Sequence, residues 1–302
     1  MPIEPPDASI PQAVLDEMNR RLAGATHAHN TAPDPEMGGL SPEQVTRLIY
    51  SEWGAAGSPI RFNTDIPLTE LAKASFFREA RTLLKAVLDS GGVRATPSGN
   101  LPRAFVSAVL PLMCDADALA EVYRYRKAVN EQDVRPLHIA RVVAQTAGLL
   151  RLQKGILTLP RAKESLLSDA QAGELYRGLF VAFFRKFNLA YAHPFAVAAR
   201  GLQTCVGYTL YRLGIVASDW LAADALSDQA LLPAVRDEIA AGIRWHVYWT
   251  VSRVMTGRLV SPWIKWGLLE GHYEPLSEYA MELKTVRITP LYKAFLRFDL
   301  QA

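Results

Sequence analysis

Apolar positions change their spacing within residues 137–159. Before Gly148 they recur every three or four residues, the spacing of one face of a helix: Ile139, Val142, Val143 and Ala147. Pro136 suits the first turn of such a helix, because its φ is fixed and no backbone N–H is needed there. After Gly148 the pattern reads as two short strands joined by a tight turn at residues 153–155. It predicts a recognition helix followed by a β-wing, the order of a winged helix.

A short phrase of β-branched residues that ends in proline occurs three times. The copies are VRATP, ILTLP and VRITP, at residues 93–97, 156–160 and 286–290. Each copy follows a helical pattern and a junction that contains glycine. Threonine can cap a new helix and proline suits its first position, so each phrase reads as a strand that leads into a helix. The repeats predict three unequal modules of one type, and the alternative is chance similarity between short strand ends.

The predicted fold class is mainly α with short β-hairpins, in which tandem winged-helix-like modules pack with additional helices. Residues 1–40 are rich in proline and poor in apolar side chains, which predicts a flexible arm in which residues 12–23 form a short helix. Residues 41–113 are expected to form a first helical module with a degenerate wing, and residues 114–170 a second winged-helix module. Residues 171–302 are expected to be helical and to end in a third winged-helix-like module.

Local capping patterns predict two helix starts. Ser41, Pro42 and Gln44 have the order of a capping box, which predicts a helix that runs to about Trp53. The last copy of the repeated phrase ends in Thr289-Pro290 and predicts the start of the final helix.

The composition is that of a globular protein without a membrane helix. Of the 302 residues, 50% are hydrophobic and 21% are charged, and no uninterrupted apolar run reaches the ~18–20 residues that a membrane helix needs. The N-terminus lacks the pattern of a secretory signal, and Cys114 and Cys205 are too few for a disulfide framework. We therefore expect a cytoplasmic location.

Known catalytic motifs are missing from the sequence. No Walker loop, dinucleotide glycine fingerprint, nucleophile elbow or His-Glu metal helix occurs in it. We therefore expect a protein that is not an enzyme and has no cofactor or metal site, although a constellation assembled only by folding stays open. The oligomeric state is not specified by the sequence.

Positive charge concentrates on the predicted recognition module. Residues 121–163 contain nine basic and three acidic residues, a balance of +6. His138, Arg141 and Gln145 share one face of the predicted helix, and Arg and Gln make bidentate contacts to guanine and adenine in the major groove. The wing residues are placed to meet phosphates: Arg151, Gln153 and Lys154. The pattern favours double-stranded DNA as partner, and the alternative is a solvated helix face.

Tryptophans gather near the C-terminus. Trp245 and Trp249 are one helical turn apart, and Trp263 and Trp266 follow. Such a cluster can stack bases or bind a partner protein, and the alternative is a core that joins the third module to the middle helices. The second functional hypothesis is therefore a protein–protein interaction scaffold that uses winged-helix modules and a C-terminal aromatic surface.

Three long phrases resemble a known family. They are PLTELAKASFFREARTLLKAVLDSGGVRATPSGNLPR, LHIARVVAQTAGLLRLQKGILTLPRAK and ITPLYKAFLRF, at residues 67–103, 137–163 and 288–298. Together they resemble an uncharacterised bacterial family of helical, winged-helix-like proteins, some of which accompany a plasmid-type open-reading-frame domain. The resemblance covers residues 40–300 and implies a prokaryotic or mobile-element context. No functional residue carries over from it. The leading functional hypothesis is a non-enzymatic DNA-binding protein that serves a plasmid, transposon or phage-defence system.

Overall fold

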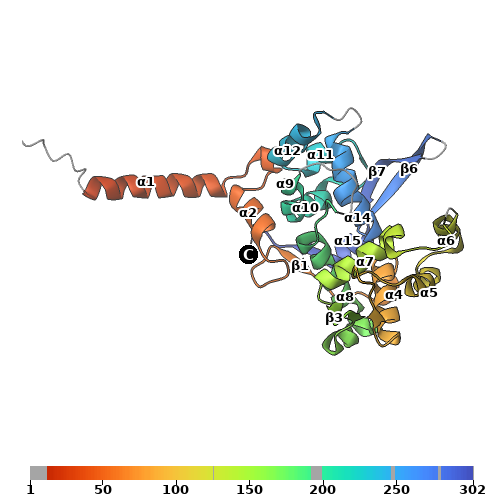
Figure 1. Cartoon of the computed structure of the whole chain (residues 1–302). Helices are drawn as coiled ribbons and strands as arrows, with labels where there is room; N and C mark the ends of the chain where they lie inside the picture. The colour runs from red at the N-terminus through yellow and green to blue at the C-terminus, as the bar shows by residue number, and fades with distance from the viewer. Residues whose placement is uncertain (1–11, 125, 192–198, 246–248, 278–279, 302) are drawn as a thin grey trace, which may run out of the picture.

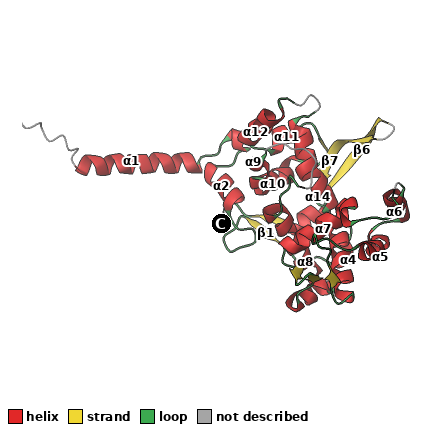
Figure 2. Ribbon diagram, viewed as in Figure 1, coloured by secondary structure: helices red, strands yellow, loops and turns green. Residues whose placement is uncertain are grey.

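The protein is mainly α, with three small antiparallel sheets (Figure 2). The computed structural model describes residues 12–124, 126–191, 199–245, 249–277 and 280–301. The helical class and the short hairpins expected from the sequence are confirmed. Within the described residues, no helix is both long and apolar enough to cross a membrane.

The first folded unit is a set of helices with one three-stranded sheet. Its elements in chain order are α4 (Ser75–Asp89), β2 (Val93–Arg94), α5 (Arg103–Met113), α6 (Ala116–Tyr123), α7 (Arg135–Thr146), β3 (Arg151–Gln153) and β4 (Ile156–Thr158). The strand order is β2-β4-β3, because Val93 of β2 pairs with Leu157 of β4. The strand expected to be the wing of a separate first module therefore belongs to the sheet of the second. The expected boundary between residues 113 and 114 divides one folded unit.

A second unit repeats this order of elements. It contains α10 (Val206–Val216), β5 (Leu221–Ala222), α11 (Leu226–Ala230), α12 (Pro233–Ile243), α13 (Val251–Met255), η6 (Thr256–Val260), α14 (Ser261–Lys265), β6 (Leu269–Ser277) and β7 (Ala280–Ile288). Its strand order, β5-β7-β6, again places the first strand beside the last. The two hairpins differ in length, and β6 and β7 project from the body of the molecule (Figure 1). The structure thus contains two units of one topology, in place of the three expected modules.

The junction between the last helical segment and the hairpin is the same in both units. Gly148 and Gly267 have φ values of 69° and 70°, a left-handed conformation that glycine adopts without a Cβ clash. The next residue closes the helix end in both: the N–H of Leu149 donates to Ala144 O at 2.8 Å, and that of Leu268 to Trp263 O at 2.9 Å. Both ends are Schellman motifs.

The repeated phrase marks equivalent positions only in its second and third copies. Residues 156–160 and 286–290 are each the last strand of a unit, followed by a proline that opens the next helical segment. The copy at 93–97 lies in the first strand, and Thr96 caps no helix there. Its carbonyl instead accepts from Gly99 N at 2.8 Å in a turn. VRATP and VRITP are therefore similar in sequence but occupy strands at different positions in the two units.

A central helix joins the two units. It consists of α8 (Ala172–Val181) and the π-helical η5 (Ala182–Lys186). Aromatic side chains recur along it at helical spacing and form the core: Tyr176, Phe180, Phe183 and Phe184. Phe184 lies 5.9 Å from Trp263, and Tyr176 donates to Trp266 O at 2.6 Å. Because η5 also contacts α7, the helices that precede the two hairpins both pack against the central helix.

The N-terminal helix and the sheet that contains the last strand lie on the same side of the body (Figure 1). Helix α1 (Gln12–Thr31) extends away from it and is longer than the helix expected at 12–23. Helix α2 (Pro42–Tyr50) begins with the predicted capping box: Ser41 N donates to Gln44 Oε1 at 3.0 Å, and Gln44 N to Ser41 Oγ at 3.3 Å. Strand β1 (Ile60–Phe62) pairs with β8 (Leu296–Phe298). The remaining elements are η1 (Pro35–Met37), α3 (Leu68–Leu71), η2 (Glu131–Asp133), η3 (Arg161–Leu167), η4 (Asp169–Gln171), α9 (Arg200–Thr204) and α15 (Pro290–Phe295).

Candidate nucleic-acid interface

The α7 face that was expected to read bases is buried. His138 is 8% exposed and Arg141 is 7% exposed. Arg141 Nε lies 2.5 Å from Glu131 Oε1, and His138 Nδ1 lies 2.6 Å from the same oxygen. Arg141 also donates to the side-chain oxygens of Gln145 and Asn100. These side chains form one internal network, which we call the Glu131 network: Asn100, Glu131, His138, Arg141, Gln145 and Tyr191.

Glu131 is the centre of the network. It is 1% exposed, and its second oxygen accepts from Leu101 N at 2.6 Å. A buried carboxylate is tolerated when charged and hydrogen-bonded groups compensate for the water that it loses. Arg141, His138 and the Leu101 N–H supply that compensation. The turn that presents Glu131 is held by Asp133, whose pKa is lowered chiefly because its carboxylate accepts from the backbone N–H of Asn130.

The outer side of the network is closed by the segment after η5. Tyr191 Oη lies 2.7 Å from His138 Nε2 and is itself partly exposed. With both ring nitrogens of His138 engaged and Arg141 paired to Glu131, neither side chain is placed to contact a base edge. The prediction that His138, Arg141 and Gln145 form a base-reading surface is therefore wrong for this conformation. This face of α7 is buried because α7 packs against η5 and because Arg141 pairs with Glu131.

The sequence holds one signal of this burial. Apolar residues occupy more than one face of α7, which is typical of a helix that is covered on several sides: Leu137, Ile139, Ala140, Val142, Val143 and Ala144. Glu131 has no comparable signal, because an acidic residue in a turn is usually solvated.

The β3–β4 hairpin, which the sequence predicted to be a wing, is exposed. Lys154 and Gly155 have φ values of 50° and 77°, so two left-handed residues connect β3 to β4 in the manner of a type I′ turn. Arg151, Gln153 and Lys154 are all exposed. A two-residue turn of this type suits the twist of the strands, so Lys154 is held at the tip of a short, well-defined hairpin.

The strand register adds a further arginine. Arg94 and Gln153 both pair with Ile156, and Arg151 pairs with Thr158, so their side chains leave the same face of the sheet. Leu157 and Val93 point to the opposite face and are buried. We define the wing surface as Arg94, Arg151, Gln153 and Lys154. Arg94 has no local sequence signal for this role, because the strands β2 and β4 that pair to place it are more than sixty residues apart.

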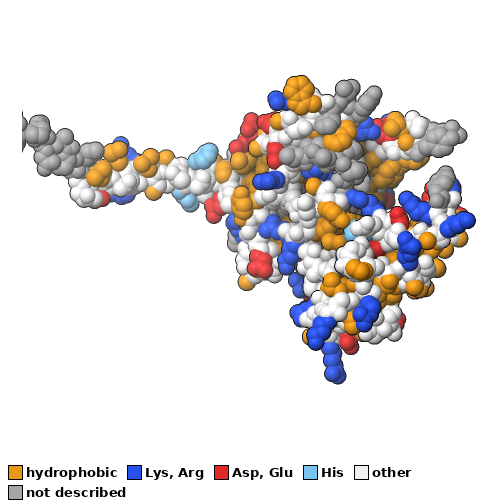
Figure 3. Space-filling view, in the orientation of Figure 1, with side chains coloured by type: hydrophobic (Ala, Val, Ile, Leu, Met, Phe, Trp, Pro, Cys, Tyr) orange, Lys and Arg blue, Asp and Glu red, His pale blue; other side chains and the backbone are white. Residues whose placement is uncertain are grey.

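The wing surface carries uncompensated positive charge. Within the described chain, none of its three basic side chains takes part in an ion pair. Exposed Arg161 and Lys163 follow β4 directly, and no acidic residue occurs between Val134 and Lys163. In Figure 3, lysine and arginine side chains gather over the end of the molecule that carries β3. The arrangement suits contact with phosphates, which require charge and exposure but no base-specific geometry.

The four tryptophans do not form a common surface. Trp263 and Trp266 are fully buried, and Trp266 lies 4.8 Å from the ring of Phe76. Their predicted role in partner binding is wrong, because they form the core between the second unit and the central helix. Trp249 is half-buried against the core. Trp245 is 80% exposed, with the guanidinium of Arg244 5.0 Å from its ring centroid.

Metal binding has no candidate in the described residues, where no three His, Cys, Asp or Glu side chains come together as ligands. No curated protein and no solved structure matches the chain. A family model matches one third of it, over a span that runs from just before α4 to the start of α8 and so covers the first unit with its wing. Residues 72–172 are similar to the Y4jL N-terminal domain.

Proposed function

We propose that the chain is a DNA-binding protein made of two winged-helix units in tandem, and that it contacts the DNA backbone through the wing surface. Each unit has a helix, a strand, three further helical segments and a hairpin, and the last of these segments runs directly into the hairpin, as in a winged helix. In each, the first strand pairs with the last. This topology supports the winged-helix interpretation of both units.

The single observation that carries the proposal is the charge of the wing surface. Arg94 and Arg151 share one face of a small sheet and Lys154 lies in the turn at its tip, and no carboxylate of the described residues forms an ion pair with them. Cationic side chains bind DNA largely by releasing counterions from phosphates, a contribution that does not depend on base sequence.

The burial of α7 sets the expected mode of binding. A helix that is covered by its own protein cannot enter the major groove, so we propose backbone contact without base readout. Non-specific binding of this kind typically has a Kd on the order of 10⁻⁴–10⁻⁶ M at physiological salt. A non-enzymatic role, a mobile-element or phage-defence setting and a cytoplasmic location stay predictions from the sequence.

The test compares two charge-matched triple variants by fluorescence anisotropy with a random-sequence DNA duplex. The wing variant carries Arg94→Gln, Arg151→Gln and Lys154→Asn. Asn is chosen at position 154 because it tolerates the left-handed conformation and so preserves the turn. We expect its affinity at low salt to fall about tenfold or more, because three cationic side chains no longer neutralise phosphates.

The control variant carries Arg61→Gln, Lys293→Gln and Arg297→Gln. These three side chains are exposed, and two of them lie on the separate β1–β8 sheet. Both variants lose the same charge. Equal losses of affinity in the two would show that only net charge matters and would contradict the role of the wing.

A second candidate function is a protein interaction scaffold. The observation that favours it is the exposed apolar end of the β6–β7 hairpin, where Tyr273, Leu276 and Met281 are 40%, 55% and 60% exposed. Photo-crosslinking from a reactive amino acid in place of Leu276, with Ile215 as an exposed control position, tests it. A crosslinked partner at both positions or at neither would contradict a specific role for the hairpin.

A further inference from the structure

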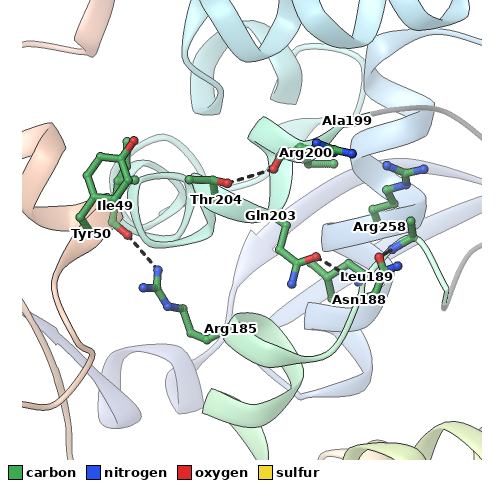
Figure 4. A pocket seen from close by; sticks show the side chains of 12 residues that line it. Ile49, Tyr50, Arg185, Asn188, Leu189, Ala199, Arg200, Gln203, Thr204 and Arg258 are labelled. Atoms are coloured by element: carbon green, nitrogen blue, oxygen red, sulfur yellow. Dashed lines mark hydrogen bonds between the residues drawn. The ribbon is translucent and has the colours of Figure 1, made fainter. Parts of the chain in front are cut away.

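A cavity lies away from the wing, between the end of α2, the turn after η5, helix α9 and η6 (Figure 4). Its volume is about 540 Å³. The side chains that matter for its chemistry are Tyr50, Arg185, Asn188, Arg200, Gln203 and Arg258. The described lining residues include three arginines and no carboxylate. We call this space the arginine cavity.

Two of the arginines lie on π-helical turns. Arg185 belongs to η5 and Arg258 to η6, and these are the two π-helical segments of the described chain. The segment η5 ends the helix that begins as α8, whereas η6 lies between α13 and α14. π-Helical turns are rare in proteins, and they occur frequently at functional sites. Both π-helical turns place an arginine at the same cavity, which supports a functional role for it independently of its size.

The arginines are held in place and partly removed from water. Arg185 donates to Ile49 O at 2.8 Å, and its guanidinium lies 5.2 Å from the centroid of the Trp53 ring. Arg258 is only 3% exposed. Burial lowers the pKa of both Arg185 and Arg258, because their charged forms lose hydration. An anion in the cavity would offset that loss at Arg185, and at Arg258 it would add to the effect of Glu238.

The carboxylate of Glu238 lies close enough to the cavity to act on Arg258, whose pKa it raises against the effect of burial. Glu238 accepts from Arg200 N at 3.0 Å and from Gly201 N at 2.9 Å, so its two oxygens cap the start of α9. It does not line the cavity. Arg200 is exposed, and Figure 4 shows its side chain on the same side of the cavity as Arg258, with Arg185 on the other.

We propose that the arginine cavity binds a small organic phosphate. Guanidinium groups match the oxygens of phosphate in bidentate geometry, and three of them suit a ligand with more than one negative charge. The volume lies within the range of roughly 300–1,000 Å³ that is usual for small-molecule sites. Tyr50, 71% exposed and part of the lining, offers a ring to the organic part of the ligand. The proposal does not depend on DNA binding by the wing.

The test is isothermal titration calorimetry of the full chain with ADP, inorganic pyrophosphate and citrate at constant ionic strength. Arg200→Gln removes an exposed charge without disturbing the core, and Arg258→Lys keeps the charge of the buried position but removes the guanidinium. Arg297→Gln, on β8, is the control. We expect both phosphates to bind, and each cavity variant to weaken them about tenfold or more because a charged hydrogen bond is removed. The control is expected to bind as the wild type does.

Three results would overturn the proposal: neither phosphate binds, both cavity variants bind as tightly as the control, or citrate binds more tightly than the phosphates. If Arg258→Lys fails to fold, Arg200→Gln still decides. The wing variant is expected to bind ADP like the wild type, so failure of the cavity and failure of the wing give different results.

Discussion

Loss of the Glu131 carboxylate should destabilise the first unit strongly. In Glu131→Gln the side-chain volume is kept, but Arg141 stays buried at 7% exposure without its counter-charge. Breaking a buried ion pair by removing one partner typically costs about 3–5 kcal/mol, because the remaining charge is desolvated and uncompensated. The hydrogen bond to His138 also loses its charged acceptor.

The assay is urea denaturation followed by circular dichroism. With a slope of about 3 kcal/mol per M, a loss of this size lowers the urea midpoint by about 1–1.7 M. Glu70→Gln is the matched control, because Glu70 forms an exposed ion pair with Lys73 at 2.6 Å. Exposed pairs contribute little to stability, so we expect its midpoint to be unchanged within error.

The double variant Glu131→Leu with Arg141→Met measures how strongly the stability effects of the two buried charges depend on each other. Replacing both buried charges by apolar side chains of similar size removes the uncompensated charge. We therefore expect the double variant to be more stable than the sum of the two single changes predicts. A wild-type midpoint for Glu131→Gln, or strict additivity in the double variant, would refute the buried network.

Two further predictions concern close packing and thiol reactivity. Gly173→Ala should destabilise the protein by about 1–3 kcal/mol, because a Cβ there would lie 1.9 Å from Thr64 O. In the same helix, a Cβ at Gly178 would meet nothing within 4 Å, so Gly178→Ala should stabilise the protein by about 1 kcal/mol. Equal urea midpoints for the two variants would contradict the close packing at Gly173. Burial raises the pKa of the Cys205 thiol to about 11, so about one thiol in a thousand is ionised at pH 8. Iodoacetamide should modify half-buried Cys114 first, and the rate at which it alkylates Cys205 should rise about tenfold from pH 8 to pH 9. If Cys205 is alkylated as fast as in the urea-unfolded chain, its burial is contradicted.

Local signals predicted the elements well where neighbouring residues decide them. The helix of residues 135–146 and its hairpin follow from Pro136, from Gly148 and from the Lys154-Gly155 turn. The start of the final helix was also predicted, since Thr289 accepts from Tyr292 N at 3.2 Å as an N-cap. Each of these features depends on backbone preferences within about five residues.

Features that depend on distant pairing could not be predicted. Strand β2 has only two residues, and its partner β4 lies beyond several further helices, so nothing local links VRATP to ILTLP. Arg141 illustrates the same limit for the site. An arginine on the polar face of a helix looks the same in sequence whether it faces DNA, water or a buried carboxylate. Its partner Glu131 is fixed by the turn before α7, and the cover comes from η5 and Tyr191.

The salt dependence of DNA binding tests the central claim most directly. For the wild type, the logarithm of the affinity should fall steeply and linearly with the logarithm of the salt concentration. The wing variant should show a slope that is shallower by roughly one for each phosphate that it no longer neutralises, or about three in all, whereas the control variant should keep the wild-type slope. No binding by the wild type at low salt, or a wing variant with the wild-type affinity and slope, would contradict the account.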